Sequence, residues 1–245
     1  MAQRYFLEIA YKGTAYHGWQ VQENALTVQA VLNQALETIL RHQVETVGCG
    51  RTDTGVHASQ HFVHVDTDLE LNERHLHSLN AILPDDIALM RFLPVAPEAH
   101  ARFDATLRAY EYHIHTQKNP FRADFSWLVK ESLDITLMNE AATFLLDYTD
   151  FSCFSKSNTQ TFTNNCKIES AYWQETQFGL VFCISADRFL RNMVRAIVGT
   201  LVDIGQGKIP PSAIRDIIES KKRSNAGVSV PACGLVLTEV HYPYI

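Results

Sequence analysis

Apolar and polar residues alternate in eight segments of the chain. Because successive side chains of an extended chain point to opposite faces, this period of two predicts strands. The expected strands cover 4–11, 46–51, 61–66, 87–94, 108–115, 167–173, 180–185 and 235–242.

Apolar residues recur at helical spacing in five other segments. The clearest covers 27–42, where Thr27 is a candidate N-cap. Its apolar face is expected to carry Val28, Val31, Leu32, Ala35, Leu36 and Ile39. Further helices are predicted at 73–82, 137–146, 189–204 and 212–219. The helix at 189–204 is expected to combine an apolar stripe with a basic edge of Arg188, Arg191 and Arg195.

The order of these elements predicts an α+β protein. Over the first hundred residues the order is strand, helix, strand, strand, helix, strand, and a similar order with an extra helix covers the remainder. We expect two ferredoxin-like halves, joined near residue 105, with antiparallel sheets packed side by side and a cleft between them. The N-terminal half would cover 1–105, and the C-terminal half, 106–245, would complete the cleft.

Composition narrows the class of protein. Of the 245 residues, 46% are hydrophobic and 20% are charged, and no uncharged stretch approaches the roughly 20 residues that span a bilayer. We therefore expect no membrane-spanning segment. The N-terminus lacks the apolar run of a secretory signal, which favours the cytoplasm. The five cysteines are scattered and never form a CxxC pair, so reduced thiols are expected.

Residues 50–58 read Gly-Arg-Thr-Asp-Thr-Gly-Val-His-Ala and follow a predicted strand. Asp53 with Gly55 two positions later is typical of a turn, which should expose the carboxylate on a loop. A turn alone could explain Asp53, whereas an aspartic protease would need a second Asp-Thr-Gly and an all-β fold. Arg51 could pair with Asp53 and keep it ionised, as a nucleophile requires, or could be an ordinary surface arginine.

On the predicted strand 108–115, Tyr110 and Tyr112 share one face. Such a pair could form an aromatic platform for an unstacked RNA base, or could consist of half-buried sheet residues. The net charge of -6 restricts any RNA-binding surface to a local basic cleft.

The string at 50–58 closely resembles the catalytic loop of the TruA family of tRNA pseudouridine synthases, usually written GRTDxGVHA. The resemblance runs in family order from about residue 5 to 243. It includes YKG at 11–13, YHGWQ at 16–20, TVQ at 27–29, NAILP at 80–84, HARF at 100–103, RAYEY at 108–112, MVRAIVG at 193–199 and GL at 234–235. The chain departs from the family at Lys12, where Asp is frequent, at Asp104, where Ser is usual, and at Cys233, where Glu is common.

The resemblance implies an isomerase that converts uridine to pseudouridine at positions 38, 39 and 40 of the tRNA anticodon stem-loop, without cofactor or metal. It assigns the essential carboxylate to Asp53, the arginine that orients it to Arg195, and contact with the target uridine to Tyr110. It also implies a homodimer. From charge and position, we expect phosphate contacts from Arg102, Arg108, Arg188 and Arg191.

Two other functions remain open from the residues alone. A non-catalytic RNA-binding module would use Asp53 only as a turn residue. A hydrolase with Asp53 as covalent nucleophile would need Mg²⁺ ligands and a phosphate-binding loop, and we find neither pattern. The histidine pairs 113/115, 61/64 and 75/77 lack carboxylates or cysteines at ligand spacing, so no metal site is predicted.

Overall fold

The computed structural model describes residues 2–156 and 162–245 of an α+β chain. It divides into two compact units. The first unit contains Met1–Thr106 together with Leu237–Ile245, and the second contains Leu107–Val236. Residues 237–245 therefore belong to the first unit, whereas the predicted division into 1–105 and 106–245 placed them in the second half.

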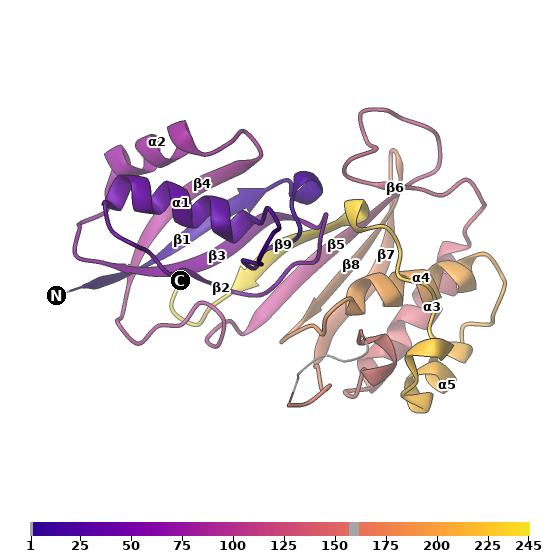
Figure 1. Cartoon of the computed structure of the whole chain (residues 1–245). Coiled ribbons are helices and arrows are strands. Elements are labelled where there is room, and N and C mark those ends of the chain that lie inside the picture. The colour runs from indigo at the N-terminus through magenta and orange to yellow at the C-terminus, as the bar shows by residue number, and fades with distance from the viewer. Residues whose placement is uncertain (1, 157–161) are drawn as a thin grey trace. The chain divides into compact units, whose positions relative to one another are not determined.

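The first unit contains an antiparallel sheet in the order β4-β1-β3, with β2 and β9 also paired to β3. The helices α1 and α2 lie together on one face of this sheet (Figure 1). The strands and helices of this unit are β1 (Gln3–Tyr11), α1 (Val28–Leu40), β2 (Val47–Gly48), β3 (His57–Thr67), α2 (Glu73–Ile82), β4 (Ile87–Val95) and β9 (Leu235–His241), whose first residues belong to the second unit.

The core of the first unit lies between this sheet and α1. Thr27 begins the helix as predicted, because its side-chain oxygen accepts the N–H of Ala30 at 3.3 Å. Arg41 then ends it with a left-handed φ of 59°. Between these ends, the predicted apolar face places Leu32 and Leu36 out of contact with solvent. Burial of a leucine of this kind contributes about 1.5–3 kcal/mol to stability.

The second unit is built on a sheet in the order β5-β8-β7, with antiparallel pairing, and β6 runs parallel to β5. Helix α3 packs on β7 and against α4 and α5. Its strands and helices are β5 (Leu107–His115), β6 (Trp127–Leu128), α3 (Ile135–Phe144), β7 (Ile168–Thr176), β8 (Gly179–Ala186), α4 (Met193–Gly205) and α5 (Ala213–Ser220). Short 3₁₀ turns occur at Gly13–Ala15, Leu145–Asp147, Ser152–Phe154, Arg223–Asn225 and Ala232–Gly234.

Two predicted elements are shorter than the sequence suggested. The helix expected at 189–204 begins only at Met193, because Asn192 adopts a left-handed φ of 67° that no helix interior allows. Arg188 and Arg191 therefore precede the helix, and the expected basic edge of three arginines is wrong. The strand expected at 46–51 is reduced to Val47–Gly48, after which the chain bends at Gly50.

No helix within the described part of the chain combines the length and apolar character needed to cross a bilayer. The longest helices, α1 and α4, have 13 residues each, whereas a membrane span needs about 20.

Candidate functional site

Asp53 lies on the loop that connects β2 to β3, as the sequence predicted, but it is half-buried rather than exposed. The carbonyl oxygen of Asp53 accepts the N–H of Val56 at 3.1 Å, which closes a turn. Gly55 occupies the third position of this turn with a φ of 80°, a conformation that glycine adopts without steric cost. The turn therefore fixes the backbone that carries the carboxylate.

A second segment, residues 16–19, holds the same loop through its backbone. The N–H of Trp19 donates to the carbonyl of Thr52 at 3.2 Å, and the N–H of Gly55 donates to the carbonyl of Tyr16 at 3.2 Å. Gly18 lies so close that a Cβ there would be 2.5 Å from the carbonyl oxygen of Thr52. Its φ of 88° also favours glycine. These backbone hydrogen bonds thus hold the loop on both sides of Asp53.

Another glycine, Gly13, packs closely against the backbone of Val56, just before β3 begins. A Cβ on Gly13 would lie 1.9 Å from the carbonyl oxygen of Val56. The N–H of Gly13 donates to Nδ1 of His57 at 3.0 Å, so this buried imidazole helps to hold the two segments together. Residues of the motifs YKG and YHGWQ therefore support the Asp53 loop.

An aromatic cluster of Tyr11, Trp19 and His61 lies behind the loop and is buried. The Trp19 and His61 ring centroids are 4.2 Å apart, and those of Tyr11 and His61 are 5.7 Å apart. The Tyr11 hydroxyl lies 2.8 Å from Oγ1 of the buried Thr52. Neither Tyr11 nor Thr52 was among the predicted site residues. Their positions offered a weak signal, since Tyr11 begins the YKG motif and Thr52 directly precedes Asp53.

The structure separates the two tyrosines of β5. Tyr112 is fully buried, and its hydroxyl donates to the carbonyl of Pro231 at 2.8 Å. This burial raises the pKa of Tyr112 far above the usual value. Tyr110 is only half-buried, and its ring meets that of Phe189 edge-on with centroids 5.2 Å apart. A platform that includes Tyr112 is therefore wrong, and Tyr112 is a core residue.

Arg195 lies in the first turn of α4 and is half-buried. Its Nε donates to the carbonyl of Val230 at 2.7 Å, and the N–H of Val230 donates back to the carbonyl of Arg195 at 3.3 Å. Because Nε supplies one of the five N–H donors of a guanidinium, this pairing orients the plane of the group.

The other arginines that were predicted as site residues lie in different environments. In the second unit, Nη1 of Arg108 donates to the carbonyl of Asp187 at 2.7 Å, and the N–H of Arg188 donates to a carboxylate oxygen of Asp187 at 2.7 Å. Arg191 is exposed. In the first unit, Arg51 and Arg102 are also exposed. Arg108 and Arg188 are thus brought together around Asp187.

The histidine pairs have contacts that explain their positions. His75 accepts the N–H of Asn72 at 3.3 Å and caps α2, and Nε2 of His113 lies 3.0 Å from the Glu111 carboxylate. His64 accepts the N–H of Ala101 at 3.1 Å. Among residues 2–156 and 162–245, no group of three or more metal-ligating side chains is assembled.

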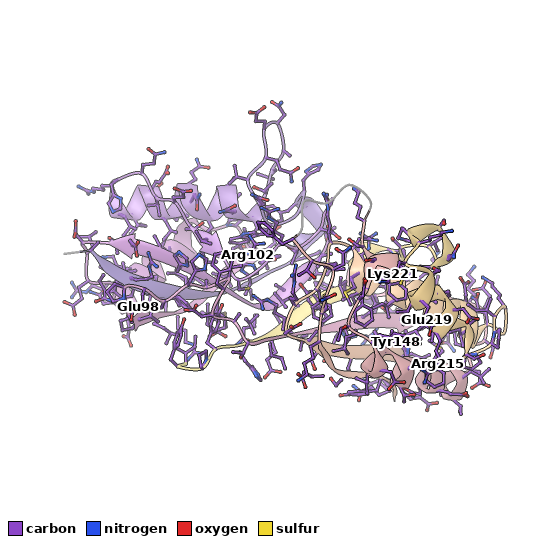
Figure 2. The ribbon with its side chains drawn as sticks, turned by 90° about the horizontal axis from the view of Figure 1, so that it is seen from below. Glu98, Arg102, Tyr148, Arg215, Glu219 and Lys221 are labelled. Atoms are coloured by element: carbon purple, nitrogen blue, oxygen red, sulfur yellow. The ribbon has the colours of Figure 1, made fainter. Side chains whose placement is uncertain are left out.

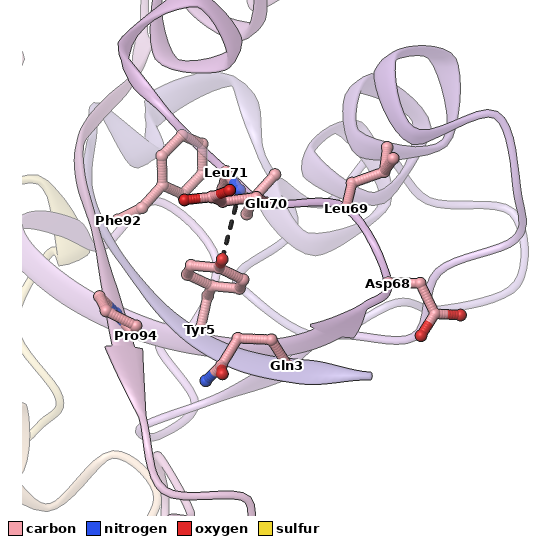
Figure 3. Close-up of a pocket in the computed structure, with 8 residues that line it drawn as sticks. All are labelled: Gln3, Tyr5, Asp68, Leu69, Glu70, Leu71, Phe92 and Pro94. Carbon is pink, nitrogen blue, oxygen red and sulfur yellow. Dashed lines mark hydrogen bonds between the residues drawn. The ribbon is translucent and has the colours of Figure 1, made fainter. Parts of the chain in front are cut away.

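A groove of about 430 Å³ opens in the first unit (Figure 3). The hydroxyl of Tyr5 accepts the N–H of Leu71 at 3.3 Å across it. Its lining is Gln3, Tyr5, Asp68, Leu69, Glu70, Leu71, Phe92 and Pro94. Gln3 begins β1, whereas Tyr11, which contacts the Asp53 loop, ends it. Eight steps of about 3.3 Å separate these ends, so the groove is remote from Asp53.

The chain matches the family model described as tRNA pseudouridine synthase over residues 9–104 and 141–243. It is 49% identical to the tRNA pseudouridine synthase A of Bacteroides fragilis, over 98% of this chain and 97% of the relative. The protein of the same name from Parabacteroides distasonis is 46% identical, with coverage of 98% and 96%. That of Exiguobacterium sibiricum is 38% identical, with coverage of 98% and 97%. The chain therefore belongs to the tRNA pseudouridine synthase family.

Proposed function

We propose that this protein isomerises uridine to pseudouridine in the anticodon stem-loop of tRNA, at positions 38, 39 and 40, with Asp53 as the essential carboxylate. The proposal is carried by one observation: backbone hydrogen bonds hold the loop in place on both sides of Asp53. A carboxylate that must act on one sugar carbon needs a fixed position, because a displacement of about 1 Å can cost 10²-fold in rate. Membership of the family supplies the class of reaction.

The reaction breaks the bond between ribose C1′ and uracil N1, rotates the base, forms a bond from C1′ to C5, and removes the C5 proton. The proton that C5 loses is matched by the one that N1 gains, so the product is an isomer. Asp53 would act as a nucleophile at C1′ or as a base at C2′. Neither course needs an oxidant or a metal, and we propose that the enzyme uses no cofactor.

Arg195 is proposed to orient Asp53 in its ionised form. A guanidinium suits that role, because its donors form a rigid fork that matches a carboxylate. Its hydrogen bond to the carbonyl of Val230 supports the proposal, since that bond limits rotation of the side chain. Tyr110 is proposed to contact the target uridine, and its partial exposure leaves part of the ring for a base. Arg51 is proposed to favour the ionised Asp53.

The remaining parts of the proposal concern RNA and assembly. Phosphate contacts are proposed for Arg102, Arg108, Arg188 and Arg191. Two ferredoxin-like halves are proposed as the architecture, and the β4-β1-β3 order with β2 on β3 supports it for the first unit. We also propose a homodimer that acts in the cytoplasm. Size-exclusion chromatography with light scattering would measure the mass of the assembly against the 27.7 kDa of one chain.

The decisive experiment is release of tritium from tRNA labelled at uridine C5, in EDTA and without added cofactor. The wild type should release tritium, and Asp53→Asn should release none while it still binds tRNA. Asp68→Asn, which removes a carboxylate from the remote groove, is the matched control and should remain active.

Two results would contradict the proposal. If neither wild type nor variant releases tritium although both bind tRNA, a non-catalytic RNA-binding module is the better account. If activity appears only when Mg²⁺ is added, the metal-free mechanism is wrong.

A further inference from the structure

Residues 226–230 of the second unit run along the first two turns of α4 and lie close to its backbone. A Cβ on Gly199 would be 1.9 Å from the carbonyl oxygen of Val228. At the end of the segment, the carbonyl of Val230 accepts the Nε–H of Arg195, and the N–H of Val230 donates to the carbonyl of Arg195. Because Arg195 and Gly199 are four residues apart, both lie on the helix face that segment 226–230 covers.

Thr200 holds the start of this segment. Its side chain is fully buried, and Oγ1 accepts the N–H of Gly227 at 2.9 Å and donates to the carbonyl of Ala196 at 3.0 Å. A Cβ on Gly227 would be 2.6 Å from the backbone nitrogen of Thr200, so the approach is close. Valine has the same shape as threonine but no hydroxyl. It would therefore remove the acceptor that the N–H of Gly227 uses.

Ser229 holds the other end. Its Oγ accepts Nδ2 of Asn192 at 2.5 Å and Nη2 of Arg223 at 2.9 Å. Nη1 of Arg223 also donates to the carbonyls of Ala226 at 3.3 Å and of Gly227 at 3.0 Å. Ser229 thus ties the segment to the residue that precedes α4, and Arg223 ties both ends of the segment together.

An ion pair fixes the chain just before this segment. Lys221, labelled in Figure 2, follows α5 with a left-handed φ of 52°, and its Nζ lies 2.8 Å from a carboxylate oxygen of Asp150. Both side chains are partly exposed, and exposed pairs of this kind contribute little. The hold on the segment therefore depends mainly on the hydrogen bonds of Thr200 and Ser229.

The direction of the Arg195 guanidinium depends on the position of the Val230 carbonyl. Nε donates to this carbonyl at 2.7 Å, and Val230 is buried. A hydrogen bond at Nε fixes the plane of the group, and the direction of its other N–H donors follows. Because the carbonyl is part of the backbone, it moves with segment 226–230. A displacement of the segment would therefore turn the guanidinium.

We propose that Thr200 and Ser229 are positioning residues for pseudouridine formation. They hold segment 226–230 on α4, and a backbone carbonyl of that segment then sets the direction of the Arg195 guanidinium. This inference rests on the proposed function, because it takes Arg195 as the arginine that orients Asp53. It extends the machinery to two hydroxyl groups that act through another residue.

Steady-state kinetics test the role of the Thr200 hydroxyl. Thr200→Val should lower kcat on the order of tenfold, less than the 10²-fold that a displacement of about 1 Å can cost, with the KM for tRNA within about twofold. Thr200→Ser keeps the hydroxyl and should restore kcat. Thr38→Val is the matched control and should be fully active. Its Oγ1 makes the same type of bond, to the carbonyl of Gln34 at 2.8 Å, but in α1 of the first unit.

A double-mutant cycle separates positioning from a general loss of structure. In the Arg195→Lys background, which lacks the guanidinium, Thr200→Val should change kcat by less than about twofold. Ser229→Ala should behave in the same way, and it provides the test if Thr200→Val does not fold, since Ser229 is only half-buried. The same fold loss of kcat in both backgrounds would overturn the proposal.

Exchange of the Arg195 Nε–H with water, measured by NMR, tests the hold on Arg195 without activity. The signal, assigned by its loss in Arg195→Lys, should exchange faster in Thr200→Val and Ser229→Ala than in wild type or Thr38→Val. Unchanged exchange and unchanged kcat in both variants would refute the positioning role while tritium release by wild type still supports the proposed function. Faster exchange in a wild-type background that makes no pseudouridine would confirm the hold on Arg195 and refute the proposed function.

Discussion

The hydroxyl of Tyr11 lies 2.8 Å from Oγ1 of Thr52, and both side chains are buried. Tyr11 ends β1 and Thr52 precedes Asp53 in the sequence. This hydrogen bond therefore ties the candidate catalytic loop to the sheet of the first unit.

Replacement of Tyr11 by Phe tests whether that bond positions Asp53. Loss of the buried hydroxyl should cost about 1–3 kcal/mol of stability, and kcat should fall by roughly 10- to 100-fold because the loop is less precisely held. The KM for tRNA should stay within about twofold. Tyr5→Phe is the control, because the Tyr5 hydroxyl bonds to Leu71 at the remote groove. Equal loss of kcat in both variants would argue against a positioning role.

Gly18→Ala should destabilise the protein. The new Cβ would lie 2.5 Å from the carbonyl oxygen of Thr52, and the φ of 88° is unfavourable for alanine. We expect the free energy of unfolding to fall by about 2 kcal/mol or more, because the left-handed conformation alone costs about 1–2 kcal/mol. Gly50→Ala provides the comparison, since its Cβ would meet nothing within 4 Å. Denaturant titration of both variants measures the difference, and similar midpoints would contradict the close approach.

Arg195→Lys should keep the positive charge but lose the hydrogen bond from Nε to the carbonyl of Val230. A lysine cannot reproduce the fork of a guanidinium. We expect kcat for pseudouridine formation to fall on the order of 10²-fold, with tRNA binding little changed. Arg188→Lys is the control and should affect mainly binding. A fully active Arg195→Lys would exclude a need for the guanidinium.

Stability should fall in mild acid because of His64. Burial lowers the pKa of His64 to about 4, and the positive charge of Arg4 contributes. A histidine in the unfolded chain has a pKa of about 6.5 and takes up a proton first, so the stabilisation is complete above 6.5 and is lost as pH falls toward 4. The loss should be on the order of 2–3 kcal/mol.

Chemical denaturation of wild type and His64→Gln at pH 7.5, 6, 5 and 4 measures this effect. Glutamine keeps an acceptor for the N–H of Ala101 but does not titrate. The variant should lose less stability than wild type over this range. Parallel curves for the two proteins would show that His64 is not responsible.

Most elements follow from local patterns in the sequence. Helix α2 has the predicted bounds, and α1 begins at the predicted N-cap Thr27, because capping and helical periodicity are local properties. The two-residue strand β6 was not predicted, since its pairing with β5 depends on residues that are distant in the chain. The late start of α4 depends on the left-handed Asn192, which propensity does not reveal.

The candidate site was predicted in part. The turn at Asp53 follows from the Asp and Gly pattern, and the structure confirms it. The support of that turn by Gly18 and Tyr11 was not predicted, because close backbone approach and a buried hydroxyl pair depend on tertiary packing. Burial also distinguishes Tyr112 from Tyr110, although the two residues are equivalent in a strand pattern.

The return of residues 237–245 to the first unit has a consequence for synthesis on the ribosome. Tyr242 packs its ring 5.0 Å from Phe6, and its hydroxyl donates to the carbonyl of Ala101 at 2.6 Å. These contacts join residues that are synthesised after the second unit with residues that are synthesised before it. Residues 107–236 can emerge and fold as a continuous piece, whereas the unit that carries Asp53 remains incomplete until residues 237–245 have also been synthesised.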